Sequence, residues 1–246
     1  MKNKIQHSIS ILLLLCVINA SLYARDKVTA TNFLSFSVGL TSSFIGGATA
    51  YQQSKFLDAY QTELSGLKYN VSASILPTTA LSFGVKYGIP FNDKIMIFTG
   101  LNYTERGFTE NFNIATSAGP IAQYQFQMIA NYWDLYFGLK YKNETGITLG
   151  IGLLTMYNVK DQINIKRTDY SNGKGTTTNT QEYFHDYYQV PRNLFPAAPF
   201  VSVGYEQKWW QVELETSYTS NIFLATAVEM NFITVGLKTS FILLWD

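Results

Sequence analysis

The side chains that could perform chemistry are few, and they gather in one stretch of the chain. Histidine, the commonest general acid or base near neutral pH, occurs only as His7 and His185. His185 lies between Glu182 and Asp186, so a nearby serine could complete the serine–histidine–acid site of a lipid-modifying hydrolase. Residues 182–188 also include four aromatic side chains. This composition favours the simpler interpretation of an aromatic loop that docks on itself or on a partner, and we predict no catalytic residue.

Other chemical signatures are missing from the sequence. It contains no glycine-rich phosphate loop, paired-histidine metal motif or dinucleotide fingerprint in a matching context. Cys16 is the only cysteine, which excludes an intrachain disulfide and a thiolate metal cluster. We therefore predict no cofactor, no metal site and no enzymatic activity.

The composition points toward a membrane. Hydrophobic residues make up 47% of the 246 residues and charged residues only 14%, where a soluble domain has about 25% charged residues. The 18 basic and 17 acidic side chains nearly balance, so nothing in the net charge indicates a nucleic-acid partner.

The N-terminal segment resembles a secretory signal peptide. Lys2 and Lys4 precede an apolar run from Ile9 to Ile18, and Ala24 offers a small residue at a plausible cleavage point. We expect a signal peptide at residues 1–24 and one exported domain at residues 25–246. Cys16 lies inside the apolar run, so the mature chain would contain no cysteine.

Beyond residue 24 the dominant pattern is alternation of apolar and small or polar residues. Period-two alternation is typical of strands that have two unlike faces. No later apolar stretch reaches the length of a membrane helix, so a chain that spans a membrane must do so as a closed barrel. The pattern predicts an all-β, eight-stranded, antiparallel up-and-down transmembrane barrel. The expected strands are 33–41, 80–87, 95–106, 132–141, 147–153, 201–206, 211–218 and 233–241.

The lengths of the connections alternate between short and long. Tight turns are expected near Pro90, Asn143 and Gln207, and extended loops at 42–78, 109–123, 160–199 and 219–228. Outer-membrane barrels keep short turns on the periplasmic side and long loops outside. Both chain ends should therefore lie on the periplasmic side. A short amphipathic helix is expected within residues 52–66, and a flexible loop tip at residues 169–176.

The two faces of the strands predict which side meets lipid. A soluble barrel of the lipocalin kind would turn its apolar side inward and present a charged exterior. Here the polar side consists mainly of Gly, Ser, Thr and Ala with a few single charges, which suits a narrow filled interior. Aromatic residues near the strand ends fit the girdles found at membrane interfaces.

In this arrangement charged residues of both signs project into the barrel interior. They are Lys86, Arg106, Asp134, Lys140, Glu206, Glu213, Glu215 and Lys238. Because an unpaired charge in a confined interior is costly, we expect them to form a salt-bridged plug. A conducting or proton-relaying path is the alternative, although eight strands leave an interior only just wide enough for side chains.

The strand Tyr132-Trp133-Asp134-Leu135-Tyr136-Phe137-Gly138-Leu139-Lys140-Tyr141 resembles the "YLEIPLLLKY" strand of PorT-like outer-membrane β-barrel proteins of Bacteroidota. The hairpin from Phe83 to Gly107 and the closing strand from Ile233 to Phe241 are similar to other parts of that family. Tyr136 stands where the family has proline. The resemblance implies a barrel in the outer membrane, and one member of the family is implicated in gliding and protein secretion.

Taken together, these patterns predict a small outer-membrane protein with a structural or interaction role carried by its extracellular loops. Its expected partners are outer-membrane lipid, the barrel assembly machinery and other envelope proteins, with no nucleic acid. A narrow channel for small solutes or ions is the first alternative, and a lipid-modifying hydrolase that uses His185 is the second.

Overall fold

The computed structural model describes residues 32–46, 61–67, 69–183, 193, 195–220, 222 and 230–245. The expected signal peptide and His185 lie outside these residues. Within them, no helix is both long and apolar enough to cross a membrane. The strands are β1 (Asn32–Gly46), β2 (Asn70–Pro90), β3 (Ile95–Thr116), β4 (Gly119–Lys142), β5 (Ile147–Ser171), β6 (Lys174–Glu182), β7 (Ala197–Glu206), β8 (Trp210–Tyr218) and β9 (Asn231–Trp245).

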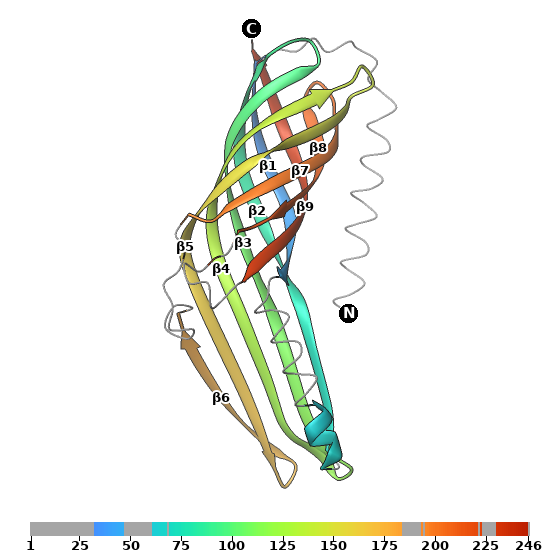
Figure 1. Ribbon diagram of the computed structural model, residues 1–246, viewed down its shortest axis with the longest axis vertical. Helices are drawn as coiled ribbons and strands as arrows, with labels where there is room; N and C mark the ends of the chain where they lie inside the picture. Colours follow the sequence, from blue (N-terminus) through green and yellow to red (C-terminus); the bar gives the residue numbers. More distant parts are fainter. Residues whose placement is uncertain are drawn as a thin grey trace.

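Eight of the strands close into an antiparallel ring, which confirms the predicted fold class (Figure 1). The ring runs β1-β2-β3-β4-β5-β7-β8-β9, and β9 pairs back onto β1 from Asn32↔Trp245 to Gly46↔Asn231. The tight turns at 91–94, 143–146 and 207–209 were predicted, and they lie at the same end of the ring as the start of β1 and the end of β9. β6 is a ninth strand outside the ring and pairs with β5.

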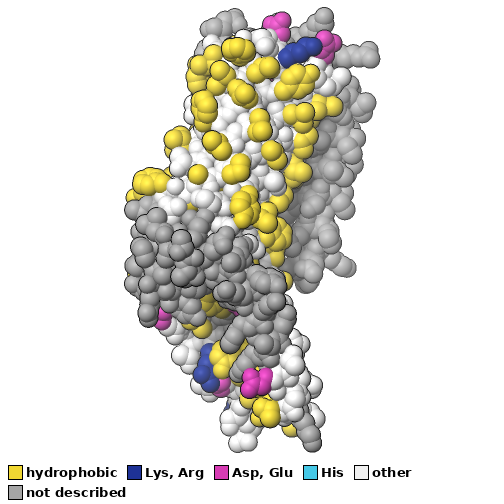
Figure 2. All heavy atoms as spheres, in the orientation of Figure 1, with side chains coloured by type: hydrophobic (Ala, Val, Ile, Leu, Met, Phe, Trp, Pro, Cys, Tyr) yellow, Lys and Arg dark blue, Asp and Glu magenta, His cyan; other side chains and the backbone are white. Residues whose placement is uncertain are grey.

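The period-two alternation of each strand places one set of its side chains inside the ring and the other set outside. Along β4, for example, Phe137 is 65% exposed, whereas its neighbour Tyr136 is 1% exposed and points inward. The same alternation recurs in every strand of the ring. On the face that Figure 2 shows, it leaves a broad surface of exposed apolar side chains.

Four strands are much longer than predicted. β3 continues to Thr116 and β4 starts at Gly119, so the loop expected at residues 109–123 is instead a hairpin with a two-residue turn. β5 likewise continues to Ser171, and β2 begins at Asn70 inside another expected loop. The outer parts of β2 to β5, together with β6, extend beyond the ring as one projecting sheet (Figure 1).

The turn between β5 and β6 also differs from its prediction. A flexible tip was expected at residues 169–176, but the chain reverses tightly at Asn172 and Gly173. Their φ angles of 52° and 74° are both positive, as a two-residue type I′ hairpin turn requires. Asn-Gly is the sequence that tolerates this geometry best, so the turn fixes the register of β6 on β5.

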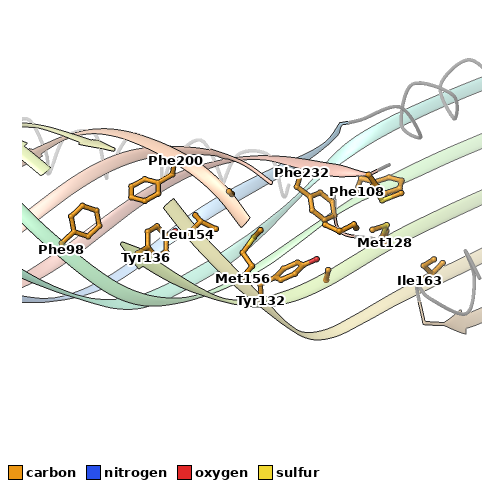
Figure 3. Packing of buried hydrophobic residues seen from close by; sticks show 14 of the residues in the cluster. Phe98, Phe108, Met128, Tyr132, Tyr136, Leu154, Met156, Ile163, Phe200 and Phe232 are labelled. Carbon is orange, nitrogen blue, oxygen red and sulfur yellow. The ribbon is translucent and has the colours of Figure 1, made fainter. Parts of the chain in front are cut away.

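Apolar side chains fill the interior toward the projecting sheet. Phe108, Met128, Ile163 and Phe232 are fully buried there (Figure 3). In the opposite direction the interior becomes mixed, because Phe98, Tyr136 and Phe200 pack among charged residues. The Tyr136 and Phe200 rings lie 5.2 Å apart, and those of Phe98 and Phe200 lie 6.0 Å apart.

Gly107 marks a close approach of β3 and β4 where the register of β2 on β3 is irregular. A Cβ atom at Gly107 would lie 1.9 Å from the carbonyl oxygen of Met128, which is backbone and cannot rotate away. Gly107→Ala should therefore lower the free energy of unfolding in detergent micelles by about 1–3 kcal/mol. Gly46→Ala is the matched control, because its Cβ would meet only the Asn231 carbonyl oxygen at 3.8 Å. Equal stability of the two variants would contradict the close approach.

Candidate functional site in the barrel interior

All eight charged residues predicted to face the interior lie on inward positions of the ring and are buried. They come from six strands: Lys86 on β2, Arg106 on β3, Asp134 and Lys140 on β4, Glu206 on β7, Glu213 and Glu215 on β8, and Lys238 on β9. Strand alternation directs them inward, because their sequence neighbours on each strand are exposed or half-exposed, with the one exception of Gly107 beside Arg106. The structure brings them together in three clusters.

The central cluster contains two lysines and two glutamates. The Lys86 Nζ lies 2.7 Å from the Glu213 Oε2 and 3.6 Å from the Glu215 Oε2. The Lys238 Nζ lies 2.7 Å from the Glu215 Oε1. Tyr136 donates its hydroxyl to the same Oε1 at 2.6 Å and accepts a hydrogen bond from Lys238 at 2.9 Å. The two positive and two negative charges balance, so the buried cluster is neutral.

This cluster links walls of the barrel that are not neighbours in the sheet. Lys86 on β2 is separated from Glu213 on β8 by β1 and β9. Tyr136 on β4 is separated from Glu215 on β8 by β5 and β7. The side chains therefore cross the interior and hold opposite walls together, and they also occupy the space that a solute would need.

A second cluster lies toward the short turns. Lys140 contacts Glu206 closely and donates to the Gln211 Oε1 at 3.2 Å. The Lys142 Nζ lies 2.8 Å from the Glu206 Oε1. The Lys140 Nζ also lies 4.7 Å from the centre of the Phe33 ring, a cation–π distance. Phe33 and this cluster lie together at the end of the interior that faces the short turns.

The third cluster is a buried arginine–aspartate pair at the boundary with the apolar core. Arg106 binds Asp134 through both terminal nitrogens, at 2.9 and 2.8 Å. Thr104 donates to the Asp134 Oδ2 at 2.8 Å, and the Arg106 Nε donates to the Thr234 Oγ1 at 3.1 Å. The guanidinium carbon also lies 5.2 Å from the centre of the Tyr132 ring. Such bidentate pairs combine charge with fixed geometry.

The clusters act as cross-links and filling. In the described part of the chain, no group of three or more His, Cys, Asp or Glu residues could hold a metal ion. The carboxylates of the central cluster accept hydrogen bonds from lysine, tyrosine and serine, including one of 2.6 Å from the Ser202 Oγ to the Glu213 Oε1. These bonds tie the β8 carboxylates both to the adjacent strand β7 and to β2 and β4 across the interior.

Among the participants that sequence reasoning missed are Tyr136, Lys142 and Gln211. Tyr136 was noted only as a departure from a family pattern, and Lys142 and Gln211 were not assigned to the interior network. The signal was present for two of them, because Tyr136 and Gln211 occupy inward positions of the same alternation as Asp134 and Glu213. Lys142 continues the inward positions of β4 two residues after Lys140, but it is the last residue of the strand and only half-buried.

Comparison with known proteins adds little. The chain matches no protein-family profile and no curated protein sequence. Among solved structures it is similar to Ail, the attachment invasion locus protein of Yersinia pestis, with 12% identity and a TM-score of 0.40 over 87% of this chain and all of Ail. It is also similar to the outer membrane protein OprG of Pseudomonas aeruginosa, with 9% identity and a TM-score of 0.30 over 88% of this chain and 98% of OprG. Neisserial surface protein A matches with 6% identity and a TM-score of 0.33 over 87% of this chain and 98% of that protein. At these values the fold assignment rests on the strand pairing of the chain itself, and the resemblance to PorT-like proteins stays a prediction.

The Arg106–Asp134 pair offers a direct test of the cross-links. Arg106→Met leaves the Asp134 carboxylate buried without its cation, and we expect a loss of about 3–5 kcal/mol in the free energy of unfolding. The double variant Arg106→Met with Asp134→Leu removes both charges and should recover most of that loss. Urea unfolding in micelles measures both. If the double variant is as unstable as the single one, the unpaired Asp134 carboxylate is not the cause of the lost stability.

Proposed function

We propose that the chain is a small outer-membrane β-barrel protein whose closed barrel anchors an extracellular β-sheet that binds other molecules. The observation that carries the proposal is the inversion of the usual pattern: exposed apolar side chains surround the outside of the ring, and its buried charges lie inside, next to the apolar core. A soluble barrel has the opposite arrangement. A closed ring also leaves no unpaired strand edge, which hydrocarbon requires.

The exposed apolar surface forms a continuous belt around the ring. It includes Phe36, Val38, Leu40, Leu81, Phe83, Val85, Leu101, Leu135, Phe137, Leu139, Leu149, Ile151, Leu153, Val201, Val203, Leu214, Leu237 and Phe241. Along β5 the belt runs from Ile147 to Tyr157, and all six residues at alternate positions are exposed. Ten steps of about 3.3 Å, on a strand tilted by about 40°, give a height of about 25 Å. That height matches the hydrocarbon band of an outer-membrane barrel.

Aromatic residues border the belt at both ends. Toward the projecting sheet, the rings of Phe83 and Tyr103 stack at 5.1 Å, and the rings of Tyr103 and Trp133 meet edge to face at 5.2 Å. Toward the short turns, the Tyr205 and Trp210 rings lie 5.9 Å apart. Aromatic girdles at these two levels are typical of membrane interfaces.

The outer membrane is the compartment that fits these features. Export is expected from the signal peptide at residues 1–24, and an outer-membrane barrel keeps its short turns on the periplasmic side. The projecting sheet then lies outside the cell. The resemblance of the β4 strand to PorT-like proteins supports membership of that group, and with it an accessory role in secretion or gliding.

We further propose that the barrel serves as an anchor and does not conduct or catalyse. The three charged clusters and the apolar core fill the interior in layers from the short turns to the projecting sheet. A large part of the described chain, in contrast, forms the projecting sheet outside the belt. Binding through that sheet is therefore the role that this construction supports best.

The membrane placement predicts a depth-dependent effect of charge on β5. Ile151→Lys, at the middle of the belt, should lower the free energy of unfolding in lipid vesicles by about 2–4 kcal/mol. Ile147→Lys, at the border of the belt, should cost about 0–1 kcal/mol. Both side chains are exposed, so the comparison separates lipid depth from packing. Equal costs would place the belt in water or in a protein interface.

The filled interior predicts that purified protein in planar bilayers shows no discrete conductance steps, while the heat-dependent shift of a folded barrel in gel electrophoresis confirms its insertion. Reproducible steps from the pure protein would revive the alternative of a narrow channel.

A further inference from the structure

The sheet that projects beyond the ring has two lateral edges, which are built differently. It consists of the outer parts of β2, β3, β4 and β5, followed by β6, in that order. β2 loses its neighbour β1 after the pair Ser43↔Thr78, and β6 is held only along β5 in the described part of the chain. Exposed strand edges can pair with another chain, so the residues that block or leave open each edge indicate where such pairing is possible.

The edge at β2 is blunted. Pro77 lies where β1 leaves, and proline removes a backbone donor from the edge. A short helix at residues 61–66, just before β2 in the chain, also contacts this edge. Its Gln61 Nε2 donates to the carbonyl oxygen of Val71 at 3.1 Å. The Gln61 side chain thus occupies a backbone carbonyl of β2 that an added strand would need as a hydrogen-bond acceptor.

Within the described residues, the edge at β6 carries no comparable device. All nine residues from Lys174 to Glu182 are exposed, and the strand contains no proline. Charges occur only at its two ends, and the seven residues between them are uncharged. Four of the seven are threonines, which pair well across antiparallel strands.

The turn geometry defines which backbone groups of β6 face outward. In a two-residue hairpin, the residues that flank the turn, Ser171 and Lys174, exchange hydrogen bonds. Alternate residues after Lys174 then face β5, and the others face away. The Thr168 and Thr177 hydroxyls lie 2.9 Å apart, as expected of a pair whose backbone groups point outward. The outward set is Gly175, Thr177, Asn179 and Gln181.

The sequence of β6 is complementary to itself when two copies run antiparallel. A two-fold axis at Thr178 places Lys174 of each copy opposite Glu182 of the other copy, so two Lys174–Glu182 pairs form. The same axis maps the outward set onto itself, so Gly175 meets Gln181 and Thr177 meets Asn179, with about eight backbone hydrogen bonds. Lys174 and Glu182 then form a non-hydrogen-bonded pair, the type in which opposite side chains lie closest together.

We propose that the free edge of β6 binds β6 of a second copy of this chain, antiparallel, and joins the two projecting sheets into one. β6 runs mainly along the long axis of the molecule (Figure 1). Two copies in one membrane are related by rotation about the membrane normal, which keeps their β6 strands pointing the same way. Antiparallel pairing therefore joins copies that face each other from two membranes. This last step rests on the proposed outer-membrane function.

A single contact of nine residues on each side is small for a stable dimer. Many copies on two facing surfaces would reinforce one another, because each contact raises the effective concentration for the next. The pairing is thus suited to adhesion between cells or vesicles that display the same protein.

Charge exchange at the ends of β6 tests the pairing. Sedimentation of the full chain in detergent micelles, where orientation is free, should show a concentration-dependent dimer. Lys174→Glu places like charges together at both ends and should weaken the dimer at least about fivefold. The double variant Lys174→Glu with Glu182→Lys restores opposite charges and should dimerise like the wild type. No dimer, or equal weakening in both variants, would overturn the proposal.

A backbone variant tests the edge itself. Asn179→Pro removes an outward N–H without touching the bonds to β5 and should abolish the dimer, whereas Asn179→Thr keeps that N–H and should preserve it. Vesicles that carry the wild type should aggregate, and vesicles that carry Asn179→Pro should not. Normal insertion with no self-association would refute the edge pairing alone, whereas failed insertion would refute the proposed membrane function. Self-association that survives Asn179→Pro would place the contact elsewhere and refute the proposal.

Discussion

Closure of the ring between the first and last strands is the constraint on which the rest of the structure depends. β1 and β9 pair over their whole length, so no ring strand has a free edge at the level of the belt. Once the ring is closed, alternation along each strand becomes a division between the interior and the outside. A slip of one residue between β1 and β9 would turn every side chain of one strand to the wrong side. The apolar belt and the charged clusters are therefore two consequences of one register.

The charged clusters reinforce that register because each charge has its partner on another strand. Lys86 meets Glu213 only if β2 and β8 stand at the observed heights, and Arg106 meets Asp134 only if β3 and β4 do. Buried ion pairs add little net stability over an apolar filling, but a misplaced partner leaves a charge buried alone. The clusters thus penalise alternative registers more than they stabilise the correct one.

The sequence was informative where the two faces of a strand meet different surroundings, and uninformative where they do not. Within the belt, Leu149 and Gly150 differ because one faces outward and the other faces the interior, so the eight strands and their turns could be predicted. In β6, Thr176, Thr177 and Thr178 are all exposed, and no alternation marks a strand. The Asn172-Gly173 pair was the available signal, because Asn-Gly between two strands predicts a hairpin. The pairing of individual charges, such as Lys86 with Glu213, could not be predicted because it depends on which strands face each other across the ring.

The continuity of β5 links the belt to the projecting sheet mechanically. The same strand carries Ile151 in the belt and, beginning at Ile163, the pairing with β6. The six residue-to-residue steps from Tyr157 to Ile163 span about 20 Å. Because Ile163 is buried in the core together with Phe108 and Met128, the base of the sheet is packed as firmly as the barrel. The inner end of β6 is therefore held at a set height above the belt by packed strands, and a loop of the same length would leave that height undefined. An edge held in a fixed position presents its end charges, Lys174 and Glu182, at set heights. These charges favour one register of two identical edges, which is the condition for a specific contact and not a general tendency to aggregate.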